Sequence, residues 1–239
     1  MSTTFTRAVV FLNPKNENPA CSHDVATLLL QLGIPDVRVT PLERIHVELN
    51  AIPHDHLPAA LYVQPGGGDD VDDSFAAYFQ SNRKLKPAVQ AFVAGGGAYL
   101  GVCLGAYAAA IDQFELVHDE QHEPFFQFDE LDDDDTPKIV PIDVDGVRYH
   151  TYHQGGPDLT PMLKVGGVPF GSYVGLSHAP PVGVVVPYWN GHGMVGLLSP
   201  HLEADATWDD AGKLAGDCND PARQFLALLF TMNQLGSNA

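Results

Sequence analysis

A chain of 239 residues, 45% of them hydrophobic, has the length of one large α/β domain or two small ones and buries on the order of 70–75% of the surface of its unfolded form. Its formal net charge of −18 argues against nucleic acid and anionic membranes as partners, because both require clustered Lys and Arg. The N-terminus shows no signal segment and no apolar run is long enough to span a bilayer, so we expect a cytoplasmic protein.

The chain contains three cysteines, Cys21, Cys103 and Cys218. They are too few and too widely spaced for a disulfide framework, and their odd number leaves at least one thiol free. A reducing compartment therefore suits this sequence best.

The first half of the chain alternates strand and helix patterns. We expect strands at residues 7–12, 37–39 and 61–63, the first of them central in the sheet. A helix between the first two strands is capped by Ser22 or Asp24 and stopped by Gly33. Another helix covers residues 87–93, with Pro87 in its first turn. This order predicts a doubly wound sheet.

Residues 95–110 read as a short buried strand, a tight turn with a cysteine, and an alanine-rich helix. Gly101 and Gly105 stand two residues before and two after Cys103, as a strained strand-to-helix elbow requires, because a Cβ at either position would collide with the backbone. A thiol at the start of a helix is favoured as thiolate by free amides and by the helix dipole. Cys103 is therefore a candidate nucleophile. The alternative is a buried cysteine that acts as a small apolar residue.

Gly66, Gly67 and Gly68 directly follow the third expected strand. Their backbone amides can approach a bound group closely, as an oxyanion site needs, although a flexible surface turn has the same composition. The carboxyl ends of parallel strands meet at one crevice, so this loop and Cys103 should lie together there.

The second half begins with residues 115–135, which include ten acidic residues and no Lys or Arg. We interpret them as a solvated excursion without a binding function. Two antiparallel hairpins should follow, with turns at Asp145-Gly146 and Asn190-Gly191. A last helix is capped by Asp220, with Gly236 beyond its end, and should cover one face of the sheet.

His201 and Glu203 follow the second hairpin. Side chains two residues apart in an extended segment point the same way, so Glu203 can hold one imidazole nitrogen while the other faces the crevice. A thiolate nucleophile needs such a base and such an orienting group. Residues 152–157 form either a wall of the crevice, with His153 or Gln154 facing substrate, or a plain glycine turn. The histidines lack the spacing of a metal site, and we assign no metal and no cofactor.

Four sequence blocks, at residues 65–69, 92–107, 152–157 and 200–203, resemble the biotin-protein ligase N-terminal domain-like proteins, within the class I glutamine amidotransferase superfamily. The resemblance covers roughly residues 7–205. It implies a single domain over residues 1–239, with a flavodoxin-like, mostly parallel sheet, helices on both faces and antiparallel hairpins added in the C-terminal half. Biotin ligation is not expected, because no room is left for the ligase catalytic domain.

By the same resemblance Cys103, His201 and Glu203 occupy the positions of a catalytic triad. The oxyanion hole is then made by the amides of Leu104 and of Gly67 or Gly68. Two features depart from the superfamily: Leu202 replaces the usual proline between the His and Glu, and the usual His-Gln after the elbow is Ala106-Tyr107. Tyr107 stands where a substrate glutamine would be held, which leaves the substrate open.

The sequence therefore predicts a cysteine-dependent hydrolase or amidotransferase that acts on an amide-type bond of a small-molecule or peptide-like substrate. The alternative is a non-catalytic ligand-binding or regulatory module that uses the same crevice. Self-association into a homo-oligomer stays open.

Overall fold

The structure is a computed structural model that describes residues 5–12, 21–67, 71–110, 113–117, 128, 130–131, 136–208 and 218–237; for residues 71–75 and 77–79 it describes the backbone only. Its main feature is a seven-stranded sheet. In spatial order the strands are β2 (Asp36–Thr40), β1 (Arg7–Phe11), β3 (Ala60–Gln64), β4 (Ala98–Val102), β10 (Met194–Leu198), β9 (Gly183–Pro187) and β7 (Val168–Phe170). The strands from β2 to β10 run parallel, and β9 is antiparallel to both of its neighbours.

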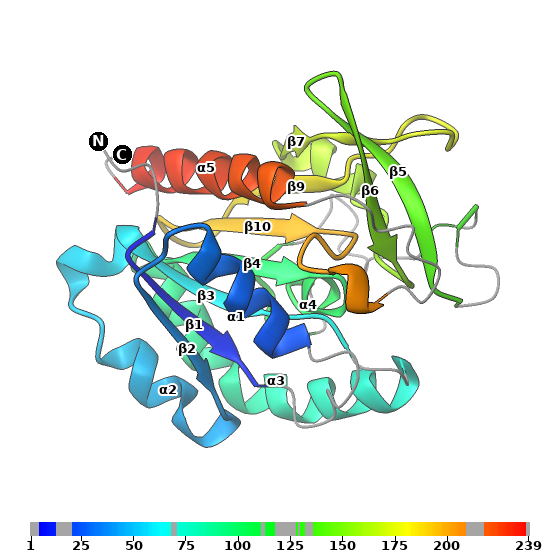
Figure 1. Cartoon of the computed structure of the whole chain (residues 1–239). Coiled ribbons are helices and arrows are strands. Elements are labelled where there is room, and N and C mark those ends of the chain that lie inside the picture. The colour runs from blue at the N-terminus through cyan, green and yellow to red at the C-terminus, as the bar shows by residue number, and fades with distance from the viewer. Residues whose placement is uncertain are drawn as a thin grey trace.

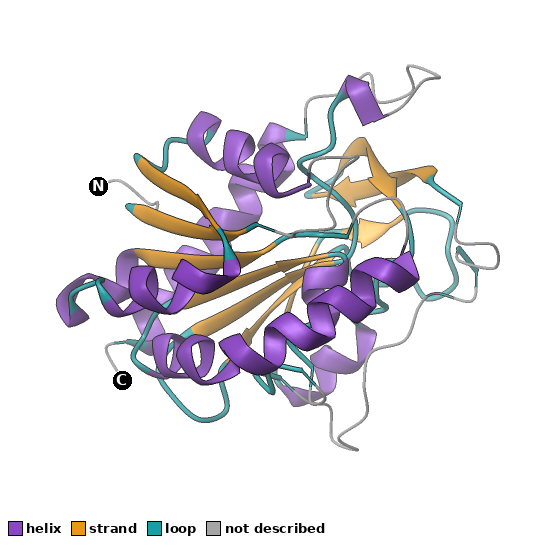
Figure 2. Cartoon of the chain, turned by 90° about the horizontal axis from the view of Figure 1, so that it is seen from below, coloured by secondary structure: helices purple, strands orange, loops and turns teal. Residues whose placement is uncertain are grey.

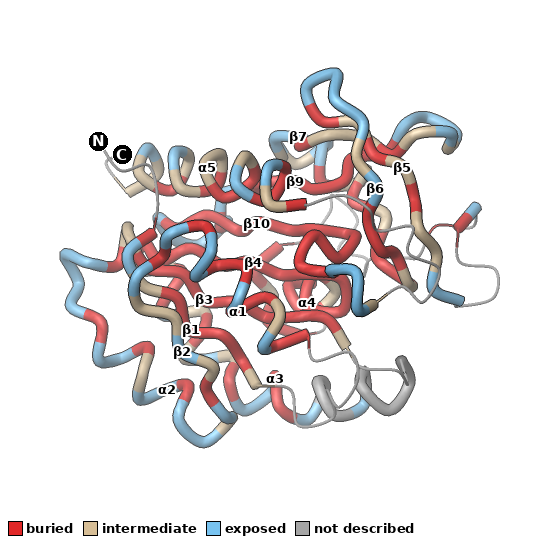
Figure 3. Tube along the Cα trace, viewed as in Figure 1, coloured by how far each residue is buried: buried red, intermediate tan, exposed pale blue. Residues whose placement is uncertain are grey.

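Helices cover both faces of this sheet (Figures 1 and 2). On one face α1 (Cys21–Gln31) and α5 (Asn219–Gly236) share a hydrophobic core with the strands, and on the other α2 (Leu42–Asn50) and α3 (Val71–Ala94) share a second core. Along β3, Leu61 and Val63 belong to the first core and Tyr62 to the second, as the alternation of side chains along a strand requires. The inner strands β1, β3, β4, β10 and β9 are almost entirely buried, which explains their apolar sequences, whereas the edge strands β2 and β7 are partly exposed (Figure 3).

A second, antiparallel sheet lies beyond the carboxyl ends of the parallel strands (Figure 1). Its strands in spatial order are β6 (Val147–His153), β5 (Lys138–Val144) and β8 (Ser172–Tyr173). The β5–β6 turn has φ +53° at Asp145 and +80° at Gly146, the left-handed conformations that an Asp-Gly hairpin adopts. A bridge between Tyr152 and His201 joins this sheet to the segment that follows β10. The second sheet thus covers the edge where the parallel strands end.

Within the described residues, the short elements are a one-turn helix α4 (Leu104–Tyr107) after β4 and the 3₁₀ helices η1 (His54–Ala59), η2 (Thr160–Val165) and η3 (Ala206–Trp208). No helix among the residues that the structure describes is both long and apolar enough to cross a membrane.

The fold class predicted from the sequence is confirmed, and so are both hairpins. Three details were wrong. Strand β1 lies next to the edge strand β2, and β4 is the middle strand. Helix α1 already begins at Cys21, which places Ser22 and Asp24 inside its first turn. Helix α5 includes Asp220 and Gly236 instead of beginning and ending at them.

Helix α3 is the largest departure from the sequence prediction, since it spans 24 residues with Pro87 in its interior. A proline there removes one backbone hydrogen bond and costs about 3 kcal/mol or more. The helix persists because Leu85 and Val89 pack into the second core on either side of the proline. Tertiary packing, which the local sequence does not reveal, therefore extends α3 through Pro87.

Candidate active site

Cys103 lies at a sharp turn between β4 and α4. Its backbone has φ +50° and ψ −113°, a conformation that non-glycine residues rarely adopt. A Cβ on Gly105 would lie 1.9 Å from the carbonyl oxygen of Gln64, and one on Gly101 would lie 2.4 Å from the carbonyl oxygen of Gly105. Both positions therefore require glycine, for the steric reason that the sequence suggested. Because α4 is only one turn long, its dipole is a smaller influence on the thiol than a long helix would be.

His201 reaches Cys103 because β10 lies beside β4. The two strands are parallel and in register, with Leu198 opposite Val102, and the amide of Cys103 donates to the carbonyl oxygen of Leu198 at 2.8 Å. The chain leaves β10 at the same edge where the elbow begins. Three residues later it presents the imidazole of His201, as expected for groups at the carboxyl ends of neighbouring parallel strands.

Glu203 orients His201. The Nδ1 atom of His201 and the Oε1 atom of Glu203 are 2.8 Å apart, and both residues are buried. The segment between them is a turn, in which the amide of Ala204 donates to the carbonyl oxygen of His201, and not the extended chain that the sequence suggested. The predicted contact is still made, because this turn brings the carboxylate back to the ring.

The imidazole is enclosed on several sides. A Cβ on Gly66 would lie 2.4 Å from Cε1 of His201, so the ring rests directly on the backbone of the glycine loop. The ring centroids of Tyr152 and Trp208 lie 5.7 Å and 5.1 Å from that of His201. The amide of His201 also donates to the carbonyl oxygen of Tyr152 at 2.9 Å. These contacts leave the ring little freedom to turn.

The electrostatics of the site favour a charged imidazole. Burial lowers the pKa of His201, but the negative charges of Cys103 and Glu203, together with hydrogen bonds to both residues, raise the pKa to about 10. An imidazolium between a sulfur and a carboxylate is the arrangement that activates a cysteine nucleophile.

Residues 152–157 cover the nucleophile. The sulfur of Cys103 lies 3.3 Å from the carbonyl oxygen of Gln154, to which it donates only while it carries its proton, and the hydroxyl of Tyr107 donates to the carbonyl oxygen of Gly155 at 3.0 Å. The side chain of Gln154 accepts from the hydroxyl of Tyr152 at 2.9 Å. Only 6% of Cys103 is exposed. This segment must therefore shift before a substrate reaches the sulfur.

The remaining predicted site residues have different places. The side chain of His153 is not turned toward Cys103: it is fully buried, its Nδ1 lies 3.1 Å from the hydroxyl of Tyr173, and its ring packs against Phe128. Of the residues predicted to form the oxyanion hole, Leu104 is the first residue of α4. Gly67 contacts α1, because its carbonyl oxygen accepts from the thiol of Cys21 at 2.8 Å. Gly68 and most of the acidic stretch 115–135 lie outside the described residues.

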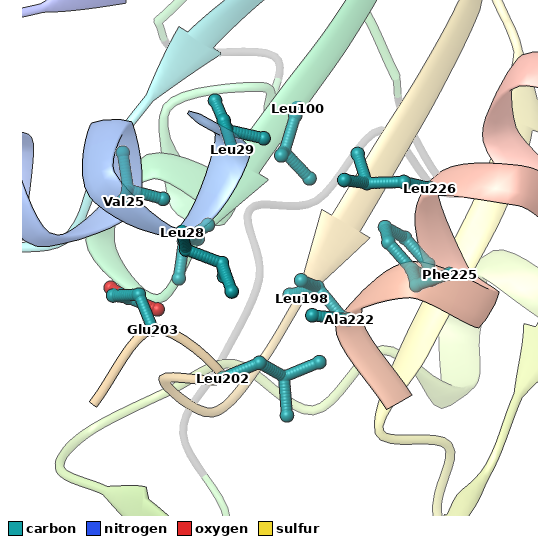
Figure 4. Close-up of a pocket in the computed structure, with 11 residues that line it drawn as sticks. Val25, Leu28, Leu29, Leu100, Leu198, Leu202, Glu203, Ala222, Phe225 and Leu226 are labelled. Atoms are coloured by element: carbon teal, nitrogen blue, oxygen red, sulfur yellow. The ribbon is translucent and has the colours of Figure 1, made fainter. Parts of the chain in front are cut away.

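One face of Glu203 borders a small apolar cavity of about 20 Å³ between the two helices of the first core (Figure 4). Leu28 of α1, Leu198 of β10 and Phe225 of α5 are among its lining residues. The cavity has room for about one water molecule and for no larger ligand. Glu203 thus also borders the hydrophobic core between α1 and α5.

Sequence reasoning missed Gly66 and Trp208 as neighbours of His201. Gly66 belongs to the glycine loop, but the family resemblance assigns the oxyanion amides to its neighbours Gly67 and Gly68. Trp208 lies five residues after Glu203 and is one of two tryptophans in the sequence. This short spacing is the signal by which sequence reasoning could have placed it near His201. Among the residues that the structure describes, no group of three or more His, Cys, Asp and Glu side chains is placed to hold a metal ion.

Comparisons with known proteins agree with this architecture. The family model described as biotin-protein ligase, N terminal, matches residues 21–123, which include the glycine loop and the elbow; the blocks at 152–157 and 200–203 lie beyond the match. No curated protein matches.

Among solved structures, PurLQS from Thermotoga maritima has a TM-score of 0.59 at 18% identity, over 93% of this chain and 98% of that one. A glutamine amidotransferase from Thermotoga maritima has a TM-score of 0.47 at 11% identity over 100% of both chains. The glutaminase domain of CTPS from Trypanosoma brucei has a TM-score of 0.47 at 12% identity, over 93% of this chain and 94% of that one. This chain therefore has a glutamine amidotransferase-like fold and, over residues 21–123, resembles the N-terminal family of biotin-protein ligases, as its motifs predict.

Proposed function

We propose that this protein is a cysteine-dependent hydrolase or amidotransferase that acts on an amide-type bond, with Cys103, His201 and Glu203 as its catalytic triad. The observation that carries the proposal is the convergence of three features: a strained elbow that presents a thiol, a buried imidazole beside it, and a carboxylate 2.8 Å from the other ring nitrogen. The likeness to amidotransferase-like folds supports the proposal at the level of the fold alone.

The proposed reaction begins with attack by the thiolate of Cys103 on the carbonyl carbon of the substrate amide. The C–O double bond opens to an oxyanion as the S–C bond forms. The amide of Leu104 is the proposed first donor to this charge, because the first amide of a helix has no acceptor within that helix, and the glycine-loop amides of Gly67 and Gly68 are the proposed second donors. The C–N bond then breaks, and His201 donates its proton to the leaving amine.

A thioester on Cys103 remains after the amine leaves. Water attacks the thioester carbon while His201 accepts a proton from that water, and the S–C bond breaks to return the thiolate. Glu203 holds the ring in the same tautomer throughout, as the third member of a triad does. If an amine attacks in place of water, the same steps give group transfer.

Preferential labelling of Cys103 tests the proposal. The three cysteines are all buried, so burial alone does not predict a reactive one. Iodoacetamide at neutral pH, followed by peptide mass spectrometry, should modify Cys103 at least about tenfold faster than Cys21 or Cys218. Equal rates at all three would refute the activated thiolate. A His201→Asn variant is the matched control, and in it the advantage of Cys103 should disappear.

A specific observation also favours a second function, that of a ligand-binding module. The hydroxyl of Tyr107, at the position where a glutamine substrate would be held, instead fixes Gly155 above the cysteine. A thermal-shift screen with small amides and amino acids separates the two functions. Stabilisation that is equal in wild type and Cys103→Ala, without turnover of any amide tested, would support the binding module and exclude the enzyme.

A further inference from the structure

Trp208, in the 3₁₀ helix η3, is fixed on two sides. Its indole Nε1 donates to Oδ2 of Asp24, in the first turn of α1, at 2.9 Å. Its ring packs edge-on against Tyr152, with centroids 5.1 Å apart and planes at 83°. A tryptophan with a hydrogen-bonded nitrogen and a packed ring has one preferred orientation. Trp208 therefore links α1, η3 and β6 through a single side chain.

The same indole lies against His201. The ring centroids are 5.1 Å apart and the planes meet at 49°. A cation within about 6 Å of an aromatic centroid is stabilised by the ring, and tryptophan is the strongest of the aromatic side chains in this respect. The site therefore offers the imidazolium an aromatic neighbour that the triad itself does not include.

We infer that Trp208, anchored by Asp24, is a positioning residue that holds the imidazole of His201 on the glycine loop and stabilises its charged form. The inference rests on the proposed function only in taking His201 as the catalytic base. It assigns to Trp208 a role that no motif in the sequence indicates, and to Asp24 the role of fixing the indole.

Other charges around His201 must be separated from this effect. Cys103 and Glu203 contact the ring directly, and Tyr152 packs edge-on against it. Asp24 is more remote, and the pKa of its carboxyl is raised, chiefly by burial. The hydrogen bond from Trp208 and the charge of His23 act in the opposite direction, whereas the charges of Glu203 and Asp205 raise the pKa further. Substituting Asp24 thus changes a charge as well as an anchor, and the variants below distinguish the two.

The test is an NMR titration of the His201 ring, assigned by comparison with His201→Asn. In Trp208→Leu the pKa of His201 should fall by about one pH unit, because the aromatic face is lost. Trp208→Phe keeps an aromatic face, so in this variant the pKa of His201 should fall by less than half of that amount. Trp189 offers a matched control, since it is exposed and its indole donates to the carbonyl oxygen of Glu115. Trp189→Leu should leave the pKa of His201 unchanged.

Two Asp24 variants test the anchor and keep the inference falsifiable if Trp208→Leu fails to fold. Asp24→Asn removes the charge but retains an oxygen that accepts from the indole, whereas Asp24→Ala removes both. The pKa of His201 should be lower in Asp24→Ala than in Asp24→Asn. An unchanged pKa in folded Trp208→Leu, or equal values in the two Asp24 variants, would overturn the inference.

These outcomes are independent of catalysis. If Cys103 is not labelled preferentially in the wild type, the proposed function fails, yet the titration still reports whether Trp208 supports the imidazolium. If labelling of Cys103 is preferential and the pKa of His201 does not respond to Trp208, the function stands and the role of Trp208 is wrong.

Discussion

The two sides of Cys103 are built differently. Below the sulfur, the elbow is fixed by backbone packing: Gly101 and Gly105 have no room for a side chain, and the amide of Cys103 is bonded to β10. Above it, the hydroxyl of Tyr107 donates to the carbonyl oxygen of Gly155. This contact lies between two anchored residues: Tyr152 is bridged to His201, and a Cβ on Gly156 would lie 2.2 Å from the carbonyl oxygen of Ser199. The elbow cannot change without disturbing the sheet, whereas we expect the cover (residues 152–157) to move at Gln154 and Gly155, between the two anchored residues. We therefore expect access to the sulfur to depend on Gln154 and Gly155 rather than on the elbow.

The largest effect is expected below the sulfur. Gly105→Ala would place a Cβ 1.9 Å from the carbonyl oxygen of Gln64, so either β3 or the elbow must move. We expect a loss of about 3 kcal/mol or more in the free energy of unfolding, measured by urea denaturation. Gly146→Ala, at a hairpin glycine with φ +80° and open space around it, is the control and should cost only about 1 kcal/mol. Equal losses would mean that the elbow is not crowded.

A smaller effect is expected between the two sides, at the triad. His201→Asn removes the cation beside the sulfur and should slow alkylation of Cys103 at pH 7 about tenfold or more, with little change in the rates at Cys21 and Cys218. Glu203→Gln keeps a hydrogen bond to the ring but removes the charge, and should slow alkylation less. If neither variant changes the alkylation rate, the imidazole of His201 does not activate the sulfur of Cys103.

The pH dependence of stability follows from the raised pKa of His201. The pKa rises from 6.5 to about 10 on folding, so the folded state binds a proton that the unfolded state has released. This contribution is complete below about pH 6.5 and is lost as the pH rises toward 10. Between these limits the melting temperature of wild type should fall more than that of His201→Asn. If the melting temperatures of wild type and His201→Asn change equally with pH, His201 is neutral in the folded protein.

The smallest effect is expected above the sulfur. Tyr107→Phe removes the bond to Gly155, worth about 0.5–1.5 kcal/mol, and should loosen the cover. Alkylation of Cys103 should then become about twofold to tenfold faster. Tyr188→Phe, in the β9–β10 turn at the other end of the hairpin from His201, loses a hydrogen bond to Asn190 and serves as the control with no change in rate. A rate that falls in Tyr107→Phe would contradict an adjustable cover.

Features encoded in local sequence were predictable. Asp145-Gly146 marks a hairpin because few residues tolerate its left-handed backbone conformation. The spacing of Gly101, Cys103 and Gly105 marks the elbow because a Cβ at either glycine would collide with the backbone. The pairing of His201 with Glu203 also followed from short spacing along the chain.

Features set by tertiary contacts were not predictable. Helix α3 continues through Pro87 because of packing that only the assembled core supplies. His153 turns toward Tyr173 because the second sheet provides a buried partner there. Trp208 meets Asp24 across a separation of 184 residues, which no local pattern encodes.

The protonation state of His201 in wild type and in Cys103→Ala tests the central claim most directly. If the ring forms an ion pair with the sulfur, NMR titration should give a pKa near 10 in wild type, and the pKa should fall by more than about one pH unit when the thiol is removed. A wild-type His201 that titrates near its ordinary pKa of 6.5, or a pKa that does not respond to Cys103→Ala, would contradict the account.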